Sequence, residues 1–378
     1  MNILIAPDSF KGNMSAAEVC AAIERGIIRA DRNAGIFKIP LADGGEGTAK
    51  TLTEAAGGRL VKTPVTDPLG RTIEAVFGLI ENGRTAVLDM AGASGMELLR
   101  REELNPLKAS SRGTGELIRA ALNAGAVNLI IGIGGSATND GGIGMLGALG
   151  FRFLDEKGED SGEGGEALAK IHRMESGGAD PRLKTVSIQT ACDVTNPLTG
   201  TQGASAVFGP QKGADPLMVK FLDEGLSRLG KIWIQAGLAQ DTDQKGDGAA
   251  GGMGAALRIC LGAKMESGAM LVMRYAGFFE ALEKADLVIT GEGRTDSQSA
   301  GGKLCSTVAR ESRKAGVPAA LLSGALEGDC QNLFPAFDYA VSISRGQPDL
   351  DSMIRDSSHD LSLAAENLIR ALILGRNL

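Results

Sequence analysis

Short apolar runs recur along the chain, and each one leads into polar residues rich in glycine. Residues 2–6, 129–131 and 287–290 have the length and aliphatic character of strands buried on both faces of a parallel sheet. A helical pattern follows each polar segment, and after the first one Ser15 and Glu18 have the spacing of a capping box. This alternation predicts βα units and therefore an α/β fold.

The middle of the chain has a different pattern. From residue 59 apolar and polar positions alternate, and Asn82-Gly83 predicts a two-residue hairpin between strands at 72–80 and 85–91. The βα pattern returns after residue 278. We therefore expect two domains. One is a parallel Rossmann- or flavodoxin-like α/β unit built from residues 1–60 and 280–378, and the other is an inserted mixed α/β domain spanning 61–279.

Glycines are especially dense between residues 132 and 144, directly after a predicted buried strand and before a predicted helix. Glycine lets backbone N–H groups approach a ligand closely, and the start of a helix favours negative charge. This segment predicts an anion site. Its expected phosphate contacts are Gly134, Gly135, Ser136, Asn139, Asp140 and Gly141.

Composition limits the classes of partner. The net charge is −7 and aromatic residues make up 4%, so we expect neither nucleic acid nor an anionic membrane surface as a partner. The five cysteines lie far apart without a C-x-x-C pair, which argues against a disulfide framework or a zinc site. No apolar run approaches the length of a membrane span and the N-terminus opens on a strand pattern, so we expect a cytoplasmic monomer or small homo-oligomer.

Charged side chains follow several of the predicted strands. Lysines and arginines at such positions can offset phosphate charge, while carboxylates can bind Mg²⁺ or accept a hydroxyl proton. Phosphoryl transfer needs this kind of positioning and charge neutralisation rather than a special nucleophile. We expect catalytic roles for Lys11, Asp193 and Asp296; substrate or phosphate contacts from Ser9, Asp43, Arg71, Arg294 and Lys303; and Mg²⁺ contacts from Asp193, Glu292 and Asp296. Which carboxylate is the base and which binds metal stays open.

Three alternative classes of protein are a P-loop enzyme, a dehydrogenase and a non-catalytic sensor. A P-loop is absent, because Gly302-Lys303 is followed by Leu304 instead of Ser or Thr. Residues 132–137 fit G-x-G-x-x-A, and Asp155 follows the next predicted strand, which is the pattern of an NAD(P)-dependent dehydrogenase of a small hydroxy acid. The dehydrogenase alternative leaves the charged residues 291–303 without a role. A non-catalytic sensor that binds a sugar acid would not explain the lysines and carboxylates in every loop.

Six motifs together resemble the type 1 glycerate kinase family. They are IAPDSFKG, ADGGEGT, IGGSATNDGG, CDVTNPLTG, FGPQKGA and TGEGRTDSQSAGGK, and they span the chain from its first strand to residue 303. The resemblance implies phosphorylation of D-glycerate to 2-phosphoglycerate with ATP and Mg²⁺. It also implies two α/β domains with the active site in the cleft between them.

Overall fold

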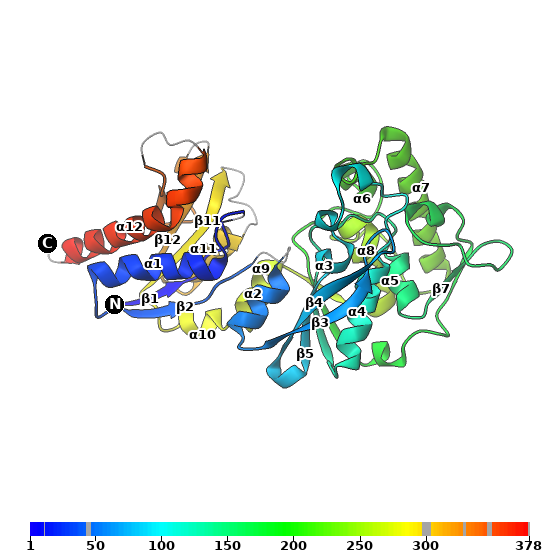
Figure 1. Cartoon of the computed structure of the whole chain (residues 1–378), viewed down its shortest axis with the longest axis horizontal. Helices are drawn as coiled ribbons and strands as arrows, with labels where there is room; N and C mark the ends of the chain where they lie inside the picture. The colour runs from blue at the N-terminus through cyan, green and yellow to red at the C-terminus, as the bar shows by residue number, and fades with distance from the viewer. Residues whose placement is uncertain (11, 43–46, 297–303, 328–329, 346–349, 377–378) are drawn as a thin grey trace. The chain divides into compact units, whose positions relative to one another are not determined.

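The chain forms two compact units in a computed structural model, which describes residues 1–10, 12–42, 47–296, 304–327, 330–345 and 350–376 (Figure 1). Unit 1 comprises Met1–Asp43 and Ala269–Leu378, and unit 2 comprises Gly44–Gly268. The predicted boundary at residue 60 is too late, because α2 (Thr48–Ala55) packs in unit 2, where the Asp89 carboxylate accepts a hydrogen bond from the Ala49 N–H at 3.0 Å. The boundary predicted at 280 is also too late, because unit 1 resumes at Ala269.

Unit 1 is a doubly wound sheet with the strand order β13-β12-β11-β1-β2, and all of its pairings are parallel. The strands are β1 (Asn2–Ile5), β2 (Gly35–Lys38), β11 (Leu287–Asp296), β12 (Ala319–Glu327) and β13 (Tyr339–Ser342). In chain order within the unit this is the flavodoxin-like order 2-1-3-4-5, so the predicted α/β fold class is confirmed. The direction of winding reverses between β1 and β11, and ligands of such sheets bind at the carboxyl ends of the strands beside that point.

Both faces of the unit 1 sheet are covered. Ala320 and Leu322 of β12 belong to the core under α1 (Ala16–Ala30) and α12 (Leu350–Arg376), while Ala319 and Leu321 belong to the core under α11 (Leu304–Lys314). Burial on both faces explains why these strands read as continuous apolar runs. The predicted capping box at Ser15 and Glu18 opens α1 and is confirmed.

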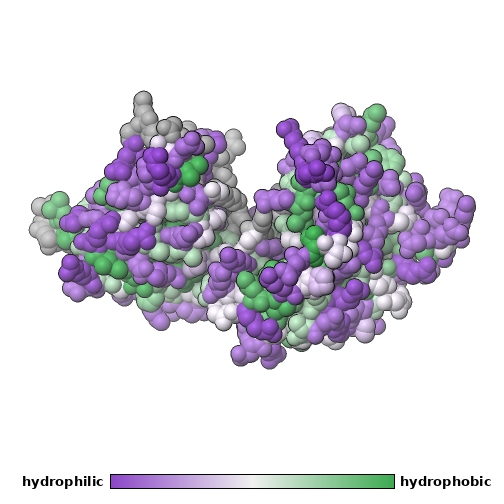
Figure 2. Space-filling model, in the orientation of Figure 1, coloured by the Kyte–Doolittle hydropathy of each residue, from purple (hydrophilic) through white to green (hydrophobic). Residues whose placement is uncertain are grey.

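Helices α1 and α12 pack closely on the same face of this sheet. A Cβ added at Gly26 of α1 would lie 2.1 Å from the carbonyl oxygen of Ser362 in α12, so glycine sets the distance between the two helices. In Figure 2 the displayed face of unit 1 mixes hydrophilic residues with small hydrophobic patches. Among the described residues no helix is both long and apolar enough to cross a membrane.

Unit 2 contains a mixed sheet with the order β10-β9-β6-β5-β4-β3. The strands are β3 (Arg59–Thr66), β4 (Thr72–Ile80), β5 (Thr85–Asp89), β6 (Asn128–Gly132), β9 (Ser187–Ala191) and β10 (Lys264–Glu266). The β3-β4 and β4-β5 pairings are antiparallel and the remaining pairings are parallel. A separate hairpin joins β7 (Arg152–Leu154) to β8 (Arg173–Glu175).

Helices α4 (Arg112–Asn123), α5 (Ile143–Ala148), α7 (Pro216–Gln235) and α8 (Ala249–Leu261) contribute to the core of unit 2. Gly125 follows the C-cap of α4 and has a φ of +95°, the left-handed conformation in which glycine commonly ends a helix. The predicted two-residue hairpin turn is wrong. Ile80 pairs with Thr85, so four residues connect β4 to β5, and Glu81, Asn82 and Gly83 all have positive φ.

Candidate active site

The carboxyl ends of β1 and β11 bring together two residues that follow separate predicted strands. Asp8 comes after β1, and its N–H donates to the carbonyl of Gly291 in β11 at 2.8 Å. Its carboxylate accepts a hydrogen bond from the N–H of Ser9 at 2.7 Å, and Asp8 is 9% exposed. Glu292 is the next residue of β11, so two carboxylates from adjacent strands lie beside the reversal of winding.

Glu292 is held by a short chain of hydroxyl groups. The Thr295 hydroxyl lies 2.8 Å from Glu292 Oε1 and 3.0 Å from the Ser323 hydroxyl of β12, and the Ser323 hydroxyl lies 2.8 Å from the carbonyl of Ala325. This chain orients the carboxylate without neutralising it. Sequence reasoning missed Thr295 and Ser323, because hydroxyl residues within a strand carry no signal of their own.

A cavity of about 530 Å³ opens at these strand ends. Its walls come from the residues after β1, from β11 and β12, from the start of α11, from the residues after β13, and from the first turns of α12. The lining residues are Asp8, Ser9, Phe10, Gly12, Asn13, Glu292, Gly293, Arg294, Leu304, Gly324, Ile343, Ser344, Met353, Ile354, Ser357 and Asp360. Of the predicted site residues within the described chain, the cavity brings together Ser9, Glu292 and Arg294.

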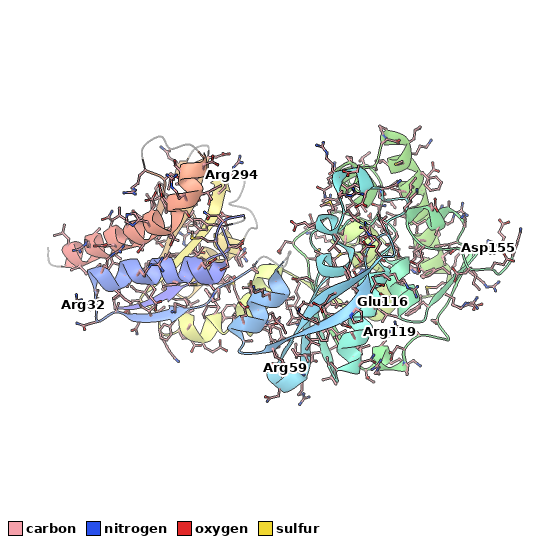
Figure 3. The ribbon with its side chains drawn as sticks, in the orientation of Figure 1. Arg32, Arg59, Glu116, Arg119, Asp155 and Arg294 are labelled. Carbon is pink, nitrogen blue, oxygen red and sulfur yellow. The ribbon has the colours of Figure 1, made fainter. Side chains whose placement is uncertain are left out.

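Strand β11 continues further than the sequence pattern predicts. The apolar pattern predicts a strand only over residues 287–290, but β11 pairs with β12 through Asp296, with Glu292 opposite Ser323 and Arg294 opposite Ala325. The Arg294 guanidinium lies at the carboxyl end of β11, 2.5 Å from Glu327, and its side chain is 68% exposed (Figure 3). The side chain of Asp296, and all of Lys11, Asp43 and Lys303, lie outside the described residues.

The predicted anion segment of unit 2 forms a glycine-rich loop, residues 133–142, after β6. Gly135, Gly141 and Gly142 have φ between +62° and +75°, which only glycine adopts readily. Gly134 is half-buried and Gly135 is exposed, so their backbone can meet a ligand. Fewer residues of this loop can therefore contact an anion than its composition predicts.

The later residues of the glycine-rich loop face the interior. Asp140 is wholly buried, and its carboxylate accepts hydrogen bonds from the Ser111 N–H and hydroxyl at 2.9 and 2.7 Å and from the Gly142 N–H at 3.0 Å. Asn139 is also wholly buried and donates to the Ser205 hydroxyl at 3.0 Å. A Cβ at Gly141 would lie 2.5 Å from Leu229. In this structure these three residues hold the loop in place and offer no surface to a phosphate.

Lys212, from the FGPQKGA motif, lies beneath this loop. Its ammonium donates to the Ser136 hydroxyl and to the Thr138 carbonyl, both at 2.7 Å, and the residue is 1% exposed. Burial lowers the pKa of Lys212 to about 7, against the opposing effect of the Asp140 charge. Burial likewise raises the pKa of Asp140. Both residues therefore position the loop from inside.

Two other predicted residues of unit 2 have separate environments. The Arg71 guanidinium pairs with Asp67 at 2.5 Å and with Glu103 at 2.9 Å, and hydrogen bonding to these carboxylates raises its pKa. Arg71 thus already forms ion pairs with two carboxylates, and these contacts stabilise the turn between β3 and β4. Asp193 is exposed and follows β9 at the carboxyl edge of the mixed sheet, consistent with a surface that a ligand can reach.

The sequence profile of the glycerate kinase family matches residues 3–373. The chain belongs to the glycerate kinase family. It is 44% identical to the glycerate kinase of Bacillus subtilis strain 168, over 100% of this chain and 99% of that protein. It is also 44% identical to the glycerate 2-kinase of Escherichia coli K12, over 99% of both chains.

A solved structure from Salmonella typhimurium LT2, described as a glycerate kinase 2, superposes with a TM-score of 0.92 at 44% identity over 100% of both chains. Membership of the glycerate kinase family and its fold are thus supported at full length, and the chain is a kinase.

The dehydrogenase alternative has no support in this glycerate kinase family member. A dinucleotide-binding turn requires an acidic residue at the end of the neighbouring strand. In the described sheets β7, which Asp155 follows, pairs with β8 and not with β6. The Asp155 carboxylate accepts hydrogen bonds from the N–H groups of Lys157 and Glu159, both at 2.9 Å, and so closes a turn beside this hairpin (Figure 3).

Proposed function

We propose that this protein transfers the γ-phosphoryl group of ATP to D-glycerate and releases ADP and 2-phosphoglycerate. The observation that carries the proposal is the full-length similarity to proteins named glycerate kinase and glycerate 2-kinase, at 44% identity. The cavity at the β1 and β11 strand ends supports it, because it combines carboxylates with an exposed arginine at the usual ligand position of this fold.

In the proposed reaction the hydroxyl oxygen at C2 of glycerate attacks the γ-phosphorus, and the bond from that phosphorus to the bridging oxygen of ADP breaks. The hydroxyl proton passes to a carboxylate. Asp8 and Glu292, which line the cavity, are our candidates for this role, and Asp193 and Asp296 stay predictions for it. Arg294, with Lys11 and Lys303 as predicted partners, offsets the charge of the migrating phosphoryl group.

The donor set at the cavity fits a nucleotide-bound Mg²⁺. Such an ion is held by one or two carboxylates, with waters and phosphate oxygens completing the octahedron. Asp8 and Glu292 supply two carboxylates from neighbouring strands, and the Thr295 hydroxyl orients one of them. Within the described residues no group of three or more His, Cys, Asp or Glu side chains could hold a metal by itself. When bound, Mg²⁺ would neutralise phosphate charge.

In unit 2, the proposal assigns an anion contact to the exposed backbone at Gly134 and Gly135. Their position after a parallel strand, with Lys212 and Asp140 fixing the loop from below, supports this role. The anion is the glycerate carboxylate or a phosphate.

The test is an ADP-release assay with D-glycerate, L-glycerate, tartronate and glucarate as separate acceptors, beside an NAD(P)H absorbance assay. We expect ADP release that depends on D-glycerate and on Mg²⁺, with no change in nicotinamide absorbance. A purified, folded protein that releases no ADP with D-glycerate, or that reduces NAD(P)⁺ with it, would overturn the proposal.

A further inference from the structure

The cavity of unit 1 has two chemically different parts. Asp8 and Ser9 follow β1, and Glu292 and Arg294 lie in the second half of β11. The side chains of Leu304, Ile343, Met353 and Ile354 come instead from the start of α11, the residue after β13 and the first turns of α12. Charged groups and aliphatic groups thus line one continuous space.

The volume of the cavity exceeds what glycerate needs. At about 530 Å³ it lies within the range of roughly 300–1,000 Å³ that drug-sized ligands occupy, several times the size of a three-carbon acid. Glycerate carries a carboxylate and two hydroxyl groups, and its one CH and one CH2 group are too small to cover four aliphatic side chains. A ligand with both a flat apolar ring and anionic groups matches the two parts together.

We infer that this cavity is the nucleotide site, with the adenine ring among Leu304, Ile343, Met353 and Ile354 and the phosphates at the β1 and β11 strand ends. The inference rests on the proposed function, since only the ATP of that reaction carries an apolar ring. The position beside the reversal of winding supports it, because doubly wound sheets bind nucleotides there.

The start of α12 is fixed to the rest of the cavity by polar contacts. The Asn13 side-chain amide donates to the Ser357 hydroxyl at 2.7 Å, and Arg345 pairs with Asp360 at 2.5 Å. Helix α12 is thereby held against the residues that follow β1 and β13. The apolar wall is preformed, which reduces the entropic cost of ordering it around a base.

The discriminating experiment compares Ile354→Ala with Ile234→Ala in the full-length protein. Both isoleucines are 42% exposed, but Ile234 belongs to α7 of unit 2 and is not among the residues that line the cavity. We expect Ile354→Ala to raise the KM for ATP roughly 10-fold while the KM for D-glycerate stays within about twofold of wild type. Ile234→Ala should change neither constant, and Met353→Ala should repeat the effect of Ile354→Ala.

Calorimetric titration with ADP, without any acceptor, separates the inference from the proposed function. The Kd for ADP should rise by about the same factor in Ile354→Ala, and ATP with a photoreactive azide on its base should label peptides of α12. If wild type phosphorylates D-glycerate but Ile354→Ala raises only the KM for D-glycerate, or binds ADP as tightly as wild type, the inference is wrong and the proposed function stands. If wild type binds ADP through Ile354 yet phosphorylates no acid, the proposed function fails and the site assignment stands.

Discussion

Among the charged residues that unit 2 buries, Lys212 and Asp140 act on the same loop from opposite ends. Lys212 holds Ser136 and Thr138, while Asp140 holds Ser111, at the start of α4, and Gly142, at the start of α5. Burying a charged group costs several kcal/mol unless its hydrogen bonds are made. The contacts made by both residues therefore fix one loop geometry, leaving Gly134 and Gly135 at the surface.

The buried lysine predicts a pH dependence of stability. Because the pKa of Lys212 falls from its ordinary value of 10.5 to about 7 on folding, the unfolded chain binds the extra proton between these values, and the free energy of unfolding rises with pH. From pH 7 to 8.5 this group should add about 1.5 kcal/mol in wild type. Urea unfolding of wild type and Lys212→Met at both pH values measures the difference.

The interval from pH 7 to 8.5 lies below the pH range in which three cysteines lower the free energy of unfolding. Burial raises the pKa of Cys20 and Cys260 to about 12 and that of Cys192 to about 11, so these thiols lower stability above their unfolded value near 9. If Lys212→Met gains as much stability as wild type between the two pH values, Lys212 is not the group responsible.

Glu292 predicts a change in activity with little change in stability. Glu292→Gln keeps an oxygen that can accept the Thr295 hydrogen bond, so the fold should persist, but it removes a charge at the proposed phosphate site. We expect kcat to fall about 100-fold with an unchanged melting temperature. Glu24→Gln is the matched control, because Glu24 is also half-buried in unit 1 but pairs with Lys38 of β2 and does not line the cavity. A kcat near wild type in Glu292→Gln would remove Glu292 from the site.

For single residues, the sequence indicates which segments contain candidate binding residues, but it does not indicate which of their side chains face a ligand. The density of glycine and polar residues after β6 predicts an anion loop. Whether Asn139 and Asp140 point outward depends on Ser205 and Ser111, which lie 66 and 29 positions away in the chain. No local pattern encodes such partners.

At the scale of elements, the contact between α1 and α12 sets the geometry beneath the cavity. Gly26→Ala would place a Cβ against the backbone of Ser362, and the helices must separate to accept it. We expect a loss of about 1–3 kcal/mol in the free energy of unfolding, measured by urea denaturation. Gly375→Ala, at a helical position of α12 with no atom within 4 Å, should be neutral or stabilising by about 0.5 kcal/mol. Equal effects of the two substitutions would contradict this account of the helix contact.

Sequence patterns misplace the ends of those elements whose secondary structure depends on contacts with residues far away in the chain. The second half of β11 reads GEGRTD, which has no apolar alternation, and becomes strand because β12 supplies its hydrogen bonds. Helix α12 begins at Leu350, but its first turns are mostly polar, so the apolar pattern indicates only its later turns. That difference hides Met353, Ile354 and Ser357, so sequence reasoning finds the carboxylate end of the cavity and misses its aliphatic wall.

At the scale of the whole molecule, the two ends of the chain build one sheet. Ile3 of β1 pairs with Ile36 on one side and with Leu287 on the other, so unit 1 requires residues from both termini. The βα pattern at both ends predicts this return, because buried parallel strands need neighbours on both sides. Unit 2 has its own core around Trp233, Phe77 and Leu226.

The central claim is that this protein phosphorylates the C2 hydroxyl of D-glycerate with ATP. Proton-coupled ³¹P NMR of the product tests it most directly, because a phosphate at C2 couples to the single proton on that carbon, whereas a phosphate at C3 couples to two. We expect a new ester signal, split as a doublet, that grows with ADP and requires Mg²⁺. A triplet would contradict the site of phosphorylation, and the absence of any new ester signal from active-concentration, folded protein would contradict the activity itself.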